Sequence, residues 1–170
     1  DLHSFPTRRS SDLEIDERMK GTIILSGKSG SGKDMTAQFM KEELAKHGQK
    51  ALGIHYADAV KWFCRDFLDW DGKKDEVGRT LLQMVGTDIV RAKHPNFWVG
   101  IVVGLIQAFE PYKDFDVAII PDARFPNEVN ISLENLKNSV SVYIFFHFAC
   151  VFQFFIVSLH LKSEIIFTTV

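Results

Sequence analysis

The residues with the clearest chemical potential form a glycine-rich segment near the amino end of the chain. The segment reads Gly-Lys-Ser-Gly-Ser-Gly-Lys-Asp from Gly27 to Asp34, directly after the apolar run 22–26. Glycine accepts positive φ, so backbone N–H groups in such a loop can turn inward around an anion. The lysine at its end reaches outer phosphates as a mobile charge, and a following helix points its positive dipole end at the same anion. The spacing therefore predicts a polyphosphate-binding loop between a strand and a helix.

The predicted nucleotide cradle extends from this loop into the first turn of the helix. Its members are Gly27, Lys28, Ser29, Gly30, Ser31, Gly32, Lys33, Asp34 and Met35. Lys33 is expected to neutralise charge on the transferred phosphate. Most such loops carry Ser or Thr where this chain has Asp34, whose carboxylate can hold Mg²⁺ directly or through water. A first-turn acid favoured by the helix dipole is the alternative for Asp34, and the two roles are compatible.

Further charged residues follow the other apolar runs. Asp122, after the run 117–120, is either a second metal ligand or an acid of a strand-end turn. Arg124 is suited to clamp an acceptor phosphate bidentately, or it forms a salt bridge to Glu128 that orders the loop. Asp58, with Lys61 one turn later, either positions the acceptor or caps a helix. We include Glu128 with the predicted substrate contacts.

A long periodic segment from Asp75 to Arg91 predicts a helix that carries two more cations. Arg79 and Arg91 are a little more than three turns apart, which we interpret as near one face of that helix. Either could reach an anionic substrate, although a solvent-exposed surface arginine is the favoured alternative for Arg79. Arg91 is also a catalytic candidate. The residues from Gly86 to Asp88 interrupt the pattern and indicate close contact with another element. Trp98 is expected in the core, and His55 and His94 show no partner at catalytic spacing.

The remaining pattern alternates strands with helices and predicts an α/β fold. Strands are expected at 22–26, 51–56 and 117–120, and helices at 34–46, 58–68, 75–91 and 96–109. Such alternation implies a mainly parallel sheet, whose ligands bind beyond the carboxyl ends of the strands. The glycine-rich loop, Asp58 and the segment with Asp122 and Arg124 should therefore converge on one edge.

The composition divides the chain into a core and two unusual ends. Residues 1–18 lack useful periodicity, and residues 1–13 look like translated adapter sequence, so we expect a non-native or disordered tail there. Residues 19–130 form the predicted α/β domain. From 131 to 170 apolar residues dominate, and 140–161 contains no formally charged residue. Three interpretations compete for this end: a membrane anchor, a buried element, or a non-native tail. We favour the last, in which case the domain is truncated.

Charge and cysteine content exclude several classes of partner. The formal net charge is −2, which provides no basic field for nucleic acid, so small-molecule partners are expected. Cys64 and Cys150 have no metal-ligand or disulfide spacing, which fits a cytoplasmic protein. The oligomeric state has no signature in the sequence.

Several stretches, in order and spacing, together resemble the phage-type deoxynucleoside monophosphate kinases of the P-loop nucleoside monophosphate kinase superfamily. They are Gly27 to Asp34, Tyr56 to Lys61, Trp70 to Asp75, Leu81 to Asp88, Arg91, Trp98, and Asp122 to Glu128. The resemblance covers about residues 19–130. It implies a three-layer P-loop NTPase fold and transfer of the ATP γ-phosphate, with Mg²⁺, to a deoxynucleoside monophosphate.

The chain departs from that family after Asn130. Family members continue with a helix, further strands, a cationic lid and contacts to the adenine ring, none of which is recognisable in residues 131–170. Since a lid excludes water and completes the charge clamp, the resemblance predicts an incomplete site here. Two other functions remain open. One is a membrane-attached nucleotide-binding protein without transferase activity, and the other is a metabolite kinase, because animal-type phosphomevalonate kinases have a similar Gly-Lys-Asp loop.

Overall fold

The computed structural model describes residues 21–112, 115–144, 156–161 and 164–169, the last two ranges as backbone only. The predicted tail at 1–18, the middle of the apolar run at 145–155, and Cys150 lie outside these residues. All of the predicted site residues lie inside the described ranges.

A four-stranded parallel sheet forms the centre of the molecule. Its strands are β1 (Gly21–Ser26), β2 (Ala51–Gly53), β3 (Val117–Ala123) and β4 (Ser139–Tyr143), in the spatial order β2-β3-β1-β4. All neighbouring pairs in this sheet are parallel. The predicted α/β class and parallel sheet are therefore confirmed, whereas membership of the P-loop NTPases stays a prediction.

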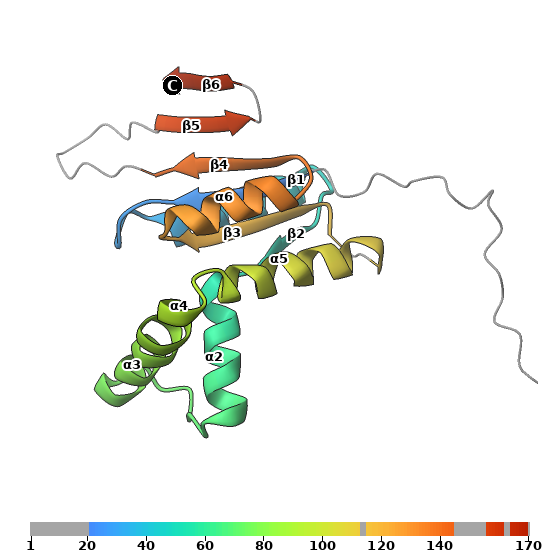
Figure 1. Cartoon of the computed structure of the whole chain (residues 1–170). Coiled ribbons are helices and arrows are strands. Elements are labelled where there is room, and N and C mark those ends of the chain that lie inside the picture. The colour runs from blue at the N-terminus through green and yellow to red at the C-terminus, as the bar shows by residue number, and fades with distance from the viewer. Residues whose placement is uncertain (1–20, 113–114, 145–155, 162–163, 170) are drawn as a thin grey trace, which may run out of the picture.

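Helices cover both faces of this sheet and give three layers (Figure 1). Helix α1 (Lys33–Lys46) packs on one face, and α5 (Phe97–Phe109) and α6 (Pro126–Asn135) pack on the other. Successive side chains of a strand point to opposite faces, so β3 supplies both cores. Ala118 and Ile120 pack in the core beneath α5 and α6, while Val117 and Ile119 pack beneath α1. Because both faces are buried, β3 is a continuous apolar run without alternation.

A second group of helices extends away from the sheet (Figure 1). It consists of α2 (Tyr56–Phe67), α3 (Glu76–Gln83), the π-helical segment η2 (Met84–Ile89) and α4 (Val90–Lys93). Val60, Cys64 and Val85 pack with Trp98 of α5, which is 1% exposed. The predicted core position of Trp98 is confirmed. A short 3₁₀ turn, η3 (Glu110–Tyr112), follows α5.

The predicted continuous helix from Asp75 to Arg91 is wrong in one respect, because η2 divides it. An added Cβ on Gly86 would lie 3.2 Å from a methyl group of Val60 on α2, a tight contact that glycine avoids. The Gly86 carbonyl, released from regular α-helical pairing, accepts a hydrogen bond from Trp98 Nε1 at 3.0 Å. The close contact predicted for this interruption is confirmed.

Strand β3 is longer than we predicted. We predicted an apolar strand over 117–120 that ends at Pro121-Asp122, and a proline lacks the N–H that a central strand donates. The strand instead continues to Ala123, and its pairing with β1 shifts between Ile24 and Ser26. The irregularity lies opposite Pro121, so a local bulge accommodates the missing donor.

The α/β domain also continues past the boundary that we placed at residue 130. That boundary falls inside α6, and β4 pairs along β1 from Thr22 with Ser139 to Ser26 with Tyr143. Leu136, Val142 and Ile144 are buried. For residues 139–144 the buried-element interpretation is therefore correct. The strand alternates serine and valine over Ser139–Tyr143, but it runs directly into the apolar stretch that follows, and we assigned the whole stretch by its composition.

Beyond β4 the backbone forms an antiparallel pair, β5 (Ile156–Leu161) and β6 (Glu164–Thr169). In the part of the chain that the structure describes, no helix is both long and apolar enough to cross a membrane.

Candidate functional site

The glycine-rich loop lies at the carboxyl end of β1 and leads directly into α1. Gly27, Gly30 and Gly32 all have positive φ, as their predicted role requires. An added Cβ on Gly27 would also lie 2.5 Å from the Ile144 carbonyl oxygen, so the end of β4 leaves no room for a side chain there. An added Cβ on Gly30 would meet no atom within 4 Å, so the positive φ is the reason that glycine is favoured at this position.

Lys33 is the first residue of α1, and its side chain folds back over the loop. Its ammonium donates hydrogen bonds to the carbonyls of Gly27 at 2.8 Å and Lys28 at 2.7 Å. Partial burial lowers the pKa of Lys33, and the nearby charge of Arg124 lowers it further, while Asp34 and Asp122 oppose the shift. Two cations from the ends of β1 and β3 are therefore close enough to repel each other.

Asp34, the predicted metal ligand, has a highly exposed side chain, at 88%. Its carboxylate lies 3.7 Å from Nε2 of His55, the residue just before α2. Nδ1 of the same imidazole lies 3.2 Å from the Asp58 carboxylate. We predicted that His55 had no such partner, and the structure contradicts this. Its position just after β2, at the edge where ligands bind in parallel sheets, was the signal that we missed.

Asp58 lies inside helix α2 rather than at its cap, because the helix begins at Tyr56. Its carboxylate accepts a hydrogen bond from the His55 backbone N–H at 3.0 Å and one from Lys61 Nζ at 2.7 Å. Partial burial pushes the pKa of Asp58 upward, but the hydrogen bonds from Lys61 and His55 outweigh it and hold the pKa below its ordinary value. The predicted pairing of Asp58 with Lys61 on one helical turn is thus present, and Asp58 closes the amino end of α2 as a capping-box acid.

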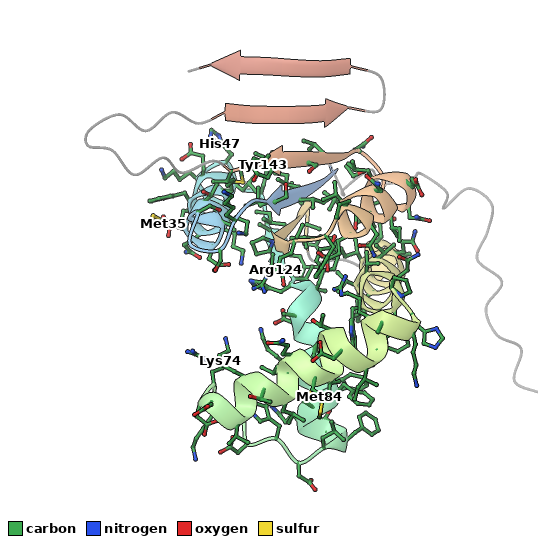
Figure 2. All side chains as sticks on the ribbon, turned by 60° about the vertical axis from the view of Figure 1, so that its left-hand side comes forward. Met35, His47, Lys74, Met84, Arg124 and Tyr143 are labelled. Atoms are coloured by element: carbon green, nitrogen blue, oxygen red, sulfur yellow. The ribbon has the colours of Figure 1, made fainter. Side chains whose placement is uncertain are left out.

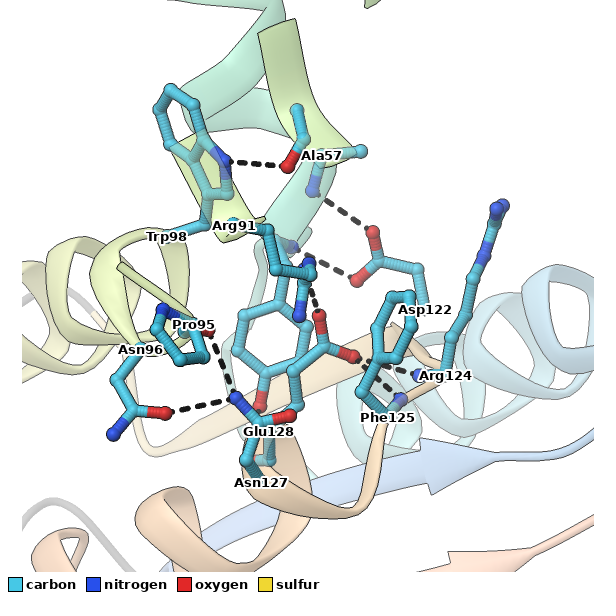
Figure 3. A network of polar contacts seen from close by, with 12 residues as sticks. Ala57, Arg91, Pro95, Asn96, Trp98, Asp122, Arg124, Phe125, Asn127 and Glu128 are labelled. Atoms are coloured by element: carbon cyan, nitrogen blue, oxygen red, sulfur yellow. Dashed lines mark hydrogen bonds and ion pairs between the residues drawn. The ribbon is translucent and has the colours of Figure 1, made fainter. Parts of the chain in front are cut away.

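Asp122, the second predicted metal ligand, holds the beginning of α2. Its two carboxylate oxygens accept hydrogen bonds from the N–H groups of Tyr56 at 2.9 Å and Ala57 at 3.0 Å (Figure 3). Burial raises the pKa of Asp122 despite these two bonds. Asp122 therefore connects the end of β3 to the group of helices beyond the sheet, and of our two interpretations the structural one accounts for its contacts.

Glu128 is paired with Arg91 and not with Arg124. Arg91 Nη2 lies 2.6 Å from Glu128 Oε1, and the two side chains are only 16% and 3% exposed. The side chain of Arg124 extends away from Glu128 (Figure 3). Its guanidinium forms no hydrogen bond or ion pair within the described ranges. The salt bridge that we considered between Arg124 and Glu128 is therefore absent, and Arg124 presents an exposed cation at the edge of the sheet (Figure 2).

Arg79 does not join these residues. It is exposed on α3, whereas Arg91 is mostly buried after η2, so the two arginines have different environments and the prediction of a shared face is not met. Lys28, Ser29 and Met35 of the predicted cradle are exposed at the loop and at the first turn of α1. Phe125, which we did not single out, lies under the Arg91 guanidinium with 4.0 Å between Cζ and the ring centroid.

The described residues form no group of three or more His, Cys, Asp or Glu side chains that could hold a metal ion. This does not conflict with a Mg²⁺ ion that is bound with a nucleotide, because Mg²⁺ commonly takes one or two carboxylates plus substrate phosphates and water. Asp34 fits that requirement, since its carboxylate is exposed beside the loop. Asp122 fits it less well, because both of its oxygens already accept backbone hydrogen bonds.

A scan against protein-family models gives no match for this chain, and a search of curated proteins finds no significant relative. The fold and the arrangement of these side chains therefore carry the functional argument, together with the sequence resemblance described above.

Proposed function

We propose that this chain is a phosphotransferase that binds ATP with Mg²⁺ at the loop from Gly27 to Gly32 and phosphorylates a deoxynucleoside monophosphate. The observation that carries the proposal is the position of Lys33. It opens α1, its ammonium lies over a loop of positive-φ glycines, and it shares the edge of the sheet with Arg124.

The electrostatics of this edge favour a polyphosphate. The helix dipole of α1 and the free N–H groups of its first turn attract an anion. Lys33 and Arg124 have no salt bridge to a carboxylate among the described residues. Desolvation and the charge of Arg124 lower the pKa of Lys33, and the negative charge of a bound phosphate would oppose this shift. Two nearby cations without carboxylate partners are a costly arrangement for a purely structural role.

Transfer requires few groups beyond these. An acceptor phosphate oxygen would attack the γ-phosphorus while the bond to the β–γ bridging oxygen breaks, and the reaction depends on charge neutralisation and alignment. Lys33 would neutralise the β and γ oxygens and Asp34 would hold Mg²⁺. Asp58 with Lys61 is the candidate for the acceptor, and Arg124 would contact the phosphate under transfer. The deoxynucleotide class of that acceptor comes from the sequence resemblance alone.

Neither alternative function gains support from a described contact. The membrane-attached protein was motivated by residues 140–161, but 139–143 form a strand of the central sheet. No described contact distinguishes a metabolite kinase from a deoxynucleotide kinase. Phosphomevalonate is therefore tested beside the deoxynucleoside monophosphates.

The test is ATP consumption with Mg²⁺ in the presence of each deoxynucleoside monophosphate in turn and of phosphomevalonate. Transfer should occur with at least one deoxynucleoside monophosphate, and Lys33→Ala should lower kcat by about 10²–10³-fold, as expected for loss of one preorganised charge. Lys46→Ala, a change on the exposed carboxyl end of the same helix, should leave the rate unchanged. Absence of transfer to every acceptor by the wild-type chain would overturn the proposal.

A further inference from the structure

The two oxygens of the Glu128 carboxylate are occupied by different parts of the molecule. Oε2 accepts hydrogen bonds from the backbone N–H groups of Arg124 at 2.8 Å and Phe125 at 3.1 Å. Oε1 accepts from Arg91 at 2.6 Å. Glu128 itself is 2% exposed and so cannot contact a substrate in this arrangement.

Arg91 links this carboxylate to the helical group beyond the sheet. Its guanidinium lies over the Phe125 ring, so the residue after Arg124 is held both by Glu128 and by Arg91. Asn127 forms a second link between the same elements, because its amide donates to the Pro95 carbonyl and to Asn96 Oδ1, both at 2.9 Å. The start of α6 is thus connected at two points to the helices beyond the sheet, to α4 through Arg91 and to the segment between α4 and α5 through Asn127 (Figure 3).

The residue whose backbone is fixed in this way is the cation without a carboxylate partner. Glu128 holds the N–H of Arg124 but leaves its guanidinium unpaired, and that guanidinium is close enough to Lys33 to lower the lysine pKa. A long arginine side chain loses less affinity to disorder when its backbone is fixed, which is the general advantage of preorganisation.

We infer that Glu128 and Arg91 are positioning residues, which hold the Arg124 backbone so that its guanidinium faces the same phosphate as Lys33. This rests on the proposed function in that it takes the ligand to be a polyphosphate. It replaces the direct catalytic and substrate roles that the sequence indicated for Arg91 and Glu128, and it assigns the contact to Arg124.

The experiment is a double-mutant cycle between Glu128→Gln and Arg124→Ala, with tripolyphosphate binding by calorimetry as the readout. The glutamine substitution keeps the size of the side chain but removes its charge. If Glu128 acts through Arg124, each single variant should weaken binding, by about 10-fold for Arg124→Ala, and the double variant should bind no more weakly than Arg124→Ala alone. Glu134→Gln, on the exposed side of the same helix, is the matched control and should bind as the wild type does.

Amide hydrogen exchange gives a second readout that needs no ligand. Protection of the Arg124 and Phe125 N–H groups should fall more in Glu128→Gln than protection of Ile119 and Ile120, because the core strand loses only what global unfolding costs. A role in overall stability alone would lower protection equally in both places, and that result would overturn the inference.

The cycle also separates this inference from the proposed function. Wild-type binding of tripolyphosphate with no transfer to any acceptor overturns the kinase proposal while the cycle still tests positioning. Fully additive losses in the cycle overturn positioning even if transfer is observed. Binding by Arg124→Ala that equals the wild type overturns it as well.

Discussion

The loop after β1 and the cluster around Glu128 lie at the same end of the sheet, yet the charges of the cluster are paired and, among the described residues, the cations near the loop are not. In the Glu128 cluster, consisting of Glu128, Arg91 and Phe125, a buried carboxylate is saturated by an arginine and two backbone N–H groups. At the loop, Lys33 bonds only to uncharged oxygens, and Arg124 beside it has no partner among the described residues.

This difference separates charges that maintain the fold from charges that are available to a ligand. Burial of an ion pair is tolerable when most of its hydrogen bonds are satisfied. Both oxygens of the Glu128 carboxylate are occupied, while Arg91 Nε is buried without a hydrogen-bond partner in the described part of the chain. Cations beside a helix amino end are repelled by the dipole and by one another, and they gain energy when an anion binds. The contrast predicts that variants of the two regions will affect stability and binding in different proportions.

The largest effect on stability is expected for Glu128→Ala. It would leave the Arg91 cation buried without its carboxylate and would release the Arg124 and Phe125 N–H groups, at a cost of about 3–5 kcal/mol in the free energy of unfolding. Urea denaturation measures this, with Glu134→Ala as the exposed control on α6, expected within about 0.5 kcal/mol of wild type. A loss below about 1 kcal/mol for Glu128→Ala would contradict the claim that the Glu128 cluster maintains the fold.

A smaller effect is expected where the loop itself meets the fold. Gly27→Ala combines a φ of 143° with a Cβ that would lie 2.5 Å from the Ile144 carbonyl oxygen, so it should destabilise by about 2–3 kcal/mol. Gly30→Ala has a φ of 75° but open space, and about 1–2 kcal/mol is expected from backbone conformation alone. Equal losses in urea denaturation would show that the contact between the loop and the end of β4 contributes nothing.

The same contrast explains which features the sequence could predict. Glycines, an apolar strand and a helix are local signals, so the loop from Gly27 to Gly32 and the parallel sheet could be predicted. Partners across the fold are not local. Glu128 lies four residues from Arg124 and thirty-seven from Arg91, and sequence proximity favoured the wrong arginine. His55 was missed for a similar reason, because Asp34 belongs to another element. The end of the domain was misplaced because the short Ser/Val alternation of β4 merges with the apolar stretch after it, and the pairing of β4 with β1 is what identifies the strand.

The ion pair of Asp58 with Lys61 is partly exposed and lies between these two extremes. Asp58→Asn should therefore lower the free energy of unfolding by less than about 1 kcal/mol near neutral pH. The pKa of Asp58 is lower in the folded protein than in the unfolded chain. Its contribution is therefore complete above the unfolded value of about 3.9 and is lost as the pH falls through the folded value.

Urea denaturation of wild type and Asp58→Asn at about pH 7 and about pH 3 tests this, and the difference between them should shrink at the lower pH. Asp66→Asn on the same helix, exposed and without a side-chain partner in the described part of the chain, is the control. A difference that is constant with pH would assign the effect to something other than the carboxylate charge.

The smallest effect on stability is expected for Arg124→Ala, and this variant tests the comparison most directly. Because the guanidinium is exposed and makes no contact with a carboxylate in the described ranges, its removal should change the free energy of unfolding by less than about 0.5 kcal/mol. Loss of its repulsion should also raise the pKa of Lys33 toward the ordinary value. Unchanged urea denaturation together with weakened tripolyphosphate binding would show that Arg124, like Lys33 at the loop, provides a charge for a ligand. A loss of stability comparable to that of Glu128→Ala would instead place it with the buried cluster, and the distinction between structural and available charge at this edge would fail.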